Sequence, residues 1–98
     1  MDVADVWVVK DDGTEIIRAR EIAAVHLDHD GNVTARLAGD IARVTLLSGR
    51  TSHDERRPGD FHRELLRVVA QLSDSSGAHL VRPAHDESRG WMWVSEPL

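Results

Sequence analysis

The sequence contains no cysteine and no tyrosine, and aromatic residues make up only 4% of it. Without cysteine the chain forms no disulfide bond, no cysteine-ligated zinc site and no thiol nucleophile. No apolar run approaches the roughly 18 residues that a membrane-spanning helix requires. The first residues are acidic and lead into no long apolar segment of the kind found in secretory signals. We therefore expect a soluble, cytoplasmic domain.

Positive charge is also scarce. The 17 acidic residues outnumber the 12 basic ones, which gives a formal net charge of −5 with histidine neutral. There is no basic arm, acidic tail or block of like charge, so bulk charge favours neither nucleic acid nor a membrane as a partner. All bases but Lys10 are arginine, which we attribute to a GC-rich coding bias.

What is present is typical of one small domain covering residues 1–98, with 41% apolar and 30% charged residues. Residues 5–47 read as a β-meander, residues 60–73 as a helix and residues 78–95 as C-terminal strands. We therefore predict an α+β fold: a five-stranded antiparallel meander packed by one helix, with one or two short C-terminal strands. This element order resembles that of bacterial pleckstrin-homology-like domains and of some LytTR-type DNA-binding domains. No sequence motif carries the resemblance, so it assigns no residue a role.

The meander rests on five segments rich in Val, Ile, Ala or Thr, namely residues 6–10, 14–18, 22–28, 32–38 and 41–47. Each turn implies a register that can be checked by asking whether apolar residues meet on one face. A loop at 29–31 predicts the pairs Leu27–Val33, Val25–Ala35 and Ala23–Leu37. A Gly39-Asp40 turn predicts Ala35–Val44 and Val33–Leu46. A loop at 11–13 predicts Val8–Ile16 and Trp7–Ile17.

The later segments follow different patterns. Asp60 is a helix cap, and the residues after it form one apolar stripe: Phe61, Leu65, Val68, Val69 and Leu72. Residues 48–59 are polar and predict a loop. Beyond the helix, residues 78–82 predict a strand stopped by Pro83, and residues 91–94 predict another.

The same registers define the outer face of the meander, with the predicted pairs Ala24–Arg36, His26–Thr34, Arg36–Arg43 and Thr34–Thr45. Two arginines directly opposite one another destabilise a sheet unless an anion or acid lies between them. Arg36 and Arg43, with His26 nearby, therefore form a candidate site for a carboxylate, a phosphate or an acidic patch of a partner. The alternative is that both side chains extend into water or reach an acid on a neighbouring strand.

The tryptophans suggest a second surface. Alternation places Trp91 and Trp93 on one face of a strand and Met92 and Val94 on the other. The strand around Trp7 is likewise apolar on both sides, whereas one helix covers only one face of a sheet. We therefore predict self-association through Trp7, Trp91 and Trp93. The alternative is that these residues complete the core of a single chain.

Motifs for catalysis, metal or cofactor binding are weak. Residues 28–32 resemble the start of a calcium loop, but Gly39 stands where the closing glutamate belongs. Residues 52–54 are Ser-His-Asp, which as neighbours cannot form a triad. The six histidines are scattered, which leaves open a site of two histidines and one carboxylate from different segments. We predict no catalytic residue, no metal and no cofactor.

We expect a small non-catalytic interaction or regulatory module of bacterial type, a homodimer that binds a protein partner with an acidic surface. One alternative is a small enzyme or ligand carrier with a pocket between helix and sheet. Another is nucleic-acid binding through arginines near the helix start, namely Arg56, Arg57, Arg63 and Arg67.

Overall fold

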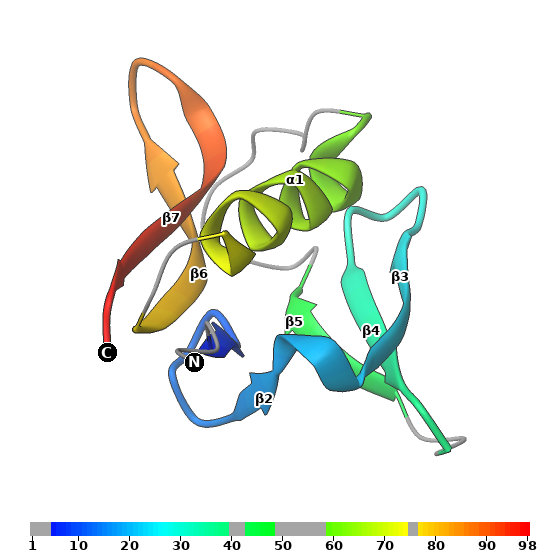
Figure 1. Cartoon of the computed structure of the whole chain (residues 1–98). Helices are drawn as coiled ribbons and strands as arrows, with labels where there is room; N and C mark the ends of the chain where they lie inside the picture. Colours follow the sequence, from blue (N-terminus) through cyan, green and yellow to red (C-terminus); the bar gives the residue numbers. More distant parts are fainter. Residues whose placement is uncertain (1–4, 40–42, 49–58, 75–76) are drawn as a thin grey trace.

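A computed structural model describes residues 5–39, 43–48, 59–74 and 77–98 (Figure 1). Within this part of the chain the fold is α+β, as predicted, with one helix and two sheets. In chain order the elements are β1 (Asp5–Val9), β2 (Ile16–Arg18), a 3₁₀ turn (Ala19–Glu21), β3 (Ile22–Leu27), β4 (Val33–Leu37), β5 (Arg43–Leu47), α1 (Phe61–Ser73), β6 (Ala78–Asp86) and β7 (Gly90–Pro97).

The predicted five-stranded meander is wrong, because the first five strands divide between the two sheets. β1 and β2 belong to a sheet of order β2-β1-β6-β7, and β3, β4 and β5 form the other. The break falls at the 3₁₀ turn Ala19–Glu21, where the chain passes from β2 to β3. β1 pairs in parallel with β6, from Asp5 opposite Ala78 to Val8 opposite Val81. The C-terminal hairpin therefore completes the sheet that contains the N-terminal strand.

The second hairpin largely confirms its predicted register. Leu27 lies opposite Val33 and Val25 opposite Ala35, as the 29–31 loop implies. The pairing of Ala23 with Leu37 is wrong, because an irregularity between Ile22 and Ala24 places Ile22 opposite Leu37 instead. A bulge of this kind cannot be inferred from apolar matching, since it inserts one residue without changing the turn.

In each of the other two hairpins the observed register differs from the predicted register by one residue over at least part of its length. Between β4 and β5, Ala35 lies opposite Val44 as predicted, but Val33 faces Leu47 rather than Leu46. The irregularity there allows both leucines to be fully buried. In the first hairpin, Val8 lies opposite Ile17 instead of Ile16, and Trp7 opposite Arg18 instead of Ile17. That register brings Val8 and Ile17 into the core together.

Pro83 does not end its strand, contrary to the prediction. β6 continues to Asp86, and Pro83 lies opposite Trp93 of β7. The pairing of β6 with β1 ends at Val81, so beyond this residue β6 has a neighbouring strand on one side only. Proline is tolerated in such an edge position because its missing N–H can face the side without a partner strand.

Helix α1 joins the two sheets. It contacts β1, β6 and β7 of one sheet and β3 of the other, and Figure 1 shows it lying between the β6–β7 hairpin and the β3–β4 hairpin. The predicted apolar stripe is confirmed: Phe61 and Leu65 are buried, and Val68, Val69 and Leu72 pack against the core. Asp60 occupies the N-cap position, although its side chain makes no capping hydrogen bond.

A hydrogen-bonded aspartate organises the turn between β3 and β4. One carboxylate oxygen of Asp28 accepts from the backbone N–H groups of Asp30 and Asn32, and the other accepts from the side-chain amide of Asn32, all at 2.9 Å. Gly31 takes the left-handed conformation (φ 86°) that the turn requires. The hydrogen bonds from Asn32 are the main reason why the pKa of Asp28 lies below its ordinary value of 3.8.

Two further turns use the same arrangement, so we predict a shared acid sensitivity. Hydrogen bonds from Thr14 to Asp12 and from Ser88 to Asp86 also lower the pKa of those aspartates. Because these pKa values are lower in the folded protein than their ordinary value of 3.8, the ionised aspartates stabilise the fold above pH 3.8. This contribution is lost as the pH falls through the lowered pKa values. Replacing Asp12, Asp28 and Asp86 with asparagine should therefore flatten the acid limb of stability. Urea unfolding of the wild type and of the triple variant at about pH 7 and about pH 3 measures this. An equal loss of unfolding free energy between the two pH values in both proteins would contradict the prediction.

Candidate functional site

The candidate site lies on the outer face of the β3-β4-β5 sheet. On the inner face, Val33 and Ala35 are fully buried, with Val25, Leu27 and Val44 packed around the same core. Because side chains alternate along a strand, the intervening positions project to the other face. The register brings four predicted pairs together on that face: Ala24–Arg36, His26–Thr34, Thr34–Thr45 and Arg36–Arg43. These four pairings are confirmed.

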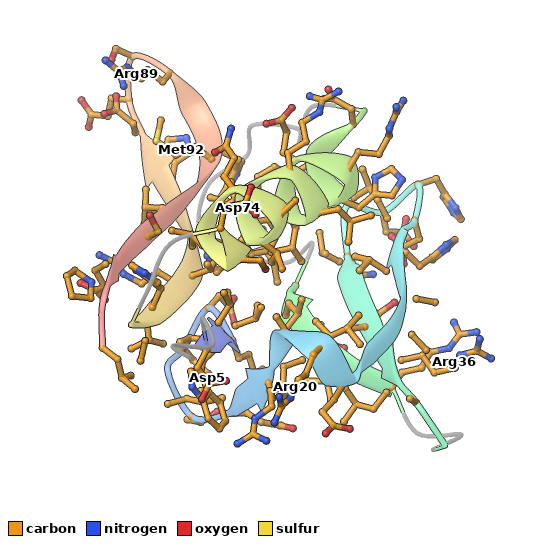
Figure 2. All side chains as sticks on the ribbon, in the orientation of Figure 1. Asp5, Arg20, Arg36, Asp74, Arg89 and Met92 are labelled. Atoms are coloured by element: carbon orange, nitrogen blue, oxygen red, sulfur yellow. The ribbon has the colours of Figure 1, made fainter. Side chains whose placement is uncertain are left out.

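The three predicted anion-binding residues line one shallow hollow. It has a volume of about 480 Å³, and Ala24, Val25, His26, Thr34, Arg36 and Arg43 surround it. This volume falls within the range of about 300–1,000 Å³ typical of ligand sites. The side chain of Arg36 projects away from the body of the molecule in Figure 2. The hollow is thus a surface feature with cationic side chains at its rim.

Arg36 and Arg43 lack acidic partners among the residues that the structure describes. Both side chains are exposed, and no ion pair or hydrogen bond joins either one to another residue of this part of the chain. Other arginines are paired: Arg18 with Asp5, Arg82 with Glu96 and Arg67 with Glu64. Two cations directly opposite one another repel, which destabilises a strand pair by up to about 1 kcal/mol.

This donor set is suited to binding an anion. Each guanidinium presents N–H groups in a planar fork that matches a carboxylate or phosphate, and the hydroxyl of Thr34 is a further donor at the same hollow. An anion placed between the two arginines would also remove their mutual repulsion. Of the predicted site residues, Arg36, Arg43 and His26 are therefore brought together in an arrangement that fits binding.

The predicted self-association residues are not brought together. Trp93 is 8% exposed, stacks on Phe61 with ring centroids 4.7 Å apart, and donates a hydrogen bond of 2.8 Å to the Phe61 carbonyl. Trp91 is equally buried and contacts His85 edge to face. A single chain therefore covers both side chains. Trp7 lies apart on β1, half-buried under Arg18, whose guanidinium is 4.8 Å from the ring centre.

The residues of the alternative functions are only partly described. Arg56 and Arg57, the 52–54 segment and Asp40 of the third turn lie outside the described residues. Two hollows beside α1 measure about 180 and 110 Å³, below the range of about 300–1,000 Å³ for ligand sites. Within the described ranges, no group of three His, Asp or Glu residues is placed to hold a metal ion. No helix in that part of the chain is long and apolar enough to cross a membrane.

Sequence reasoning missed the neighbours of Trp7. Arg18 and Leu80 flank it on β2 and β6, and neither was singled out. Arg18 was missed because the predicted register of the first hairpin was wrong by one residue. Leu80 was missed because it becomes a neighbour of Trp7 only through the parallel pairing of β1 with β6, which no local sequence pattern predicts. Alternation along residues 78–86 was the usable signal, because it separates Leu80 and Arg82 from Val81 and Pro83.

Comparison with known proteins suggests no function for this chain. The resemblance to pleckstrin-homology-like and LytTR-type domains concerned element order, and the strands pair differently from the predicted meander on which it was based. No protein-family model matches the chain, and no curated protein or solved structure matches it.

Proposed function

We propose that this protein is a small interaction module that binds an acidic surface of a protein partner through Arg36, Arg43 and His26. One observation carries the proposal: two exposed arginines lie opposite one another on adjacent strands, at the rim of a hollow, with no acid from the described part of the chain between them. The pair is destabilising for the free protein. A carboxylate from a partner would turn that repulsion into two favourable contacts.

The negative net charge of the chain is compatible with an acidic partner. Charges separated by more than the Debye length, about 8 Å at physiological ionic strength, are largely screened. Distant acidic groups therefore contribute little to the field at the hollow, and the lining residues that carry formal charge are Arg36 and Arg43. The rest of the acidic surface would keep the partner from binding elsewhere on the molecule.

The proposal includes self-association and a regulatory or accessory role in a bacterial cytoplasm. The cysteine-free sequence is compatible with a reducing compartment. A homodimer would present two arginine hollows, and two linked sites bind a partner with paired acidic patches more tightly than one.

The two alternatives have less support. Arg67 of the nucleic-acid alternative contacts Glu64 and lies 3.9 Å from Asp60, so it is already engaged within the chain. The two hollows beside α1 that the described residues line are smaller than the pocket that an enzyme or ligand carrier typically uses.

The test is the binding of a fluorescent oligoglutamate peptide, followed by anisotropy. Replacing Arg36 and Arg43 with alanine should weaken binding about tenfold, since each exposed charge pair contributes up to about 1 kcal/mol. The matched control is Arg63→Ala with Arg89→Ala, which removes the same charge from two exposed positions elsewhere. We expect the control to bind nearly as tightly as the wild type.

Three results would contradict the proposal. Equal loss in both double variants would show attraction to net charge alone, and no loss in either would dispose of the site. Tighter binding to duplex DNA, with a steep dependence on salt concentration, would favour the nucleic-acid alternative.

A further inference from the structure

The four-stranded sheet has an apolar face on the side away from the core. Its core side holds Val6, Val8, Ile17, Val81, Trp91 and Trp93. Alternation therefore places a second apolar set on the other side, namely Trp7, Val9, Leu80 and Val94. None of these four belongs to the core cluster or to the partly buried residues packed against it. We call this set, with its flanking charges, the outer face.

Val9 belongs to the outer face by alternation along β1. It is only 8% exposed, yet it is not part of the core cluster. Ile16 lies directly opposite on β2 and shares this face with Val9. Ile16 itself is 49% exposed. The outer face thus carries apolar side chains that lie outside the core cluster.

One row of this face has a defined order of charge. The three registers align Arg18 of β2, Trp7 of β1, Leu80 of β6 and Glu96 of β7 side by side across the sheet. A base stands at one end of the row, an acid at the other, and two large apolar side chains between them.

Each end of the row is held by a second charge. The Nε atom of Arg18 is 3.8 Å from a carboxylate oxygen of Asp5, and Glu96 is 3.5 Å from Nε of Arg82. These two acids and two bases balance one another around the row. A second copy would therefore meet no excess of negative charge at the row, although each chain carries −5 overall.

We propose that a second copy of this chain covers the outer face, about a two-fold axis that passes between Trp7 and Leu80. In a two-fold interface each contact is repeated with the partners exchanged. Rotating the row by half a turn brings Arg18 of one copy opposite Glu96 of the other, and Trp7 opposite Leu80. The row is thus complementary to itself in charge and in apolar contact. The inference rests on the proposed self-association and assigns it a surface, with Trp7 rather than Trp91 and Trp93 at its centre.

The test is solution mass by light scattering over a hundredfold concentration range of the full chain. The wild type should form a dimer. Trp7→Ser should weaken dimerisation roughly 30-fold, the loss typical of a central aromatic anchor. The control is Leu66→Ser, which removes an exposed apolar side chain from α1 (55% exposed) and should leave the dimer intact. Circular dichroism verifies that each variant is folded.

A second variant covers the case in which Trp7→Ser does not fold. Glu96 is exposed, so Glu96→Arg should keep the fold while placing like charges opposite one another across the axis. It should also weaken the dimer. A dimer unchanged by both substitutions would overturn the assigned surface but leave self-association standing. A wild-type monomer at every concentration would overturn self-association itself, and neither result would affect oligoglutamate binding at Arg36 and Arg43.

Discussion

Trp93→Ala should lower the free energy of unfolding by about 3–5 kcal/mol. The substitution removes a buried ring that stacks on Phe61, and with it the hydrogen bond to the Phe61 carbonyl. That carbonyl lies in the first turn of α1, so the contact joins the helix to β7. Since small domains are stable by only about 5–15 kcal/mol in total, we expect a variant that is barely folded at room temperature.

The measurement is the free energy of unfolding in urea of Trp93→Ala and, as the matched control, of Trp7→Ala. Both variants lose the same type of side chain, so the difference between them reports the position. Trp7 lies outside the core cluster and is half-buried on the outer face. Its loss should therefore reduce stability by about 1–2 kcal/mol, well below the effect at Trp93. Equal losses at the two positions would contradict the placement of Trp93 at the junction of helix and sheet.

Val81→Asp should abolish folding altogether. Val81 is fully buried, and β6 carries it between Val8 of β1 and Ser95 of β7. A carboxylate buried there without a partner costs several kcal/mol. The substitution also tests the topology, because in a continuous five-stranded meander a strand after the helix would be peripheral and the N-terminal sheet would survive.

The matched control for Val81→Asp is Arg82→Asp, one residue further along β6. In the single chain Arg82 is exposed on the other face, where the new aspartate would stay in water beside Glu96. We expect that variant to keep its circular dichroism spectrum and to lose about 1 kcal/mol. A folded spectrum for Val81→Asp would contradict the central position of β6.

Sequence alone reached the features that local geometry decides. The loop at residues 29–31 and the apolar match around it determine which residues of β3 and β4 share a face, and the Gly39-Asp40 turn placed Arg36 opposite Arg43. The spacing of Phe61, Leu65 and Val68 likewise depends only on the helical repeat. The helix and the arginine pair were predictable for this reason.

The remaining features depend on contacts between distant parts of the chain. Pairing of β1 with β6 joins residues more than seventy positions apart, and no turn between them sets a register. The bulges near Ala23 and Leu46 each move one residue without altering the hydrophobic pattern. The outer face could not be predicted from the sequence either, because Trp7 and Leu80 become neighbours only through the parallel pairing of β1 with β6.

The central claim is that acidic groups bind at the paired arginines, and an NMR titration tests it most directly. Oligoglutamate added to isotope-labelled protein should shift the amide signals of Thr34, Arg36 and Arg43 and the ring signals of His26. The indole signals of Trp91 and Trp93 should stay in place, because both rings are buried in the core. Shifts concentrated at Arg63 and Arg67 on α1, or no localised shifts at all, would contradict the account.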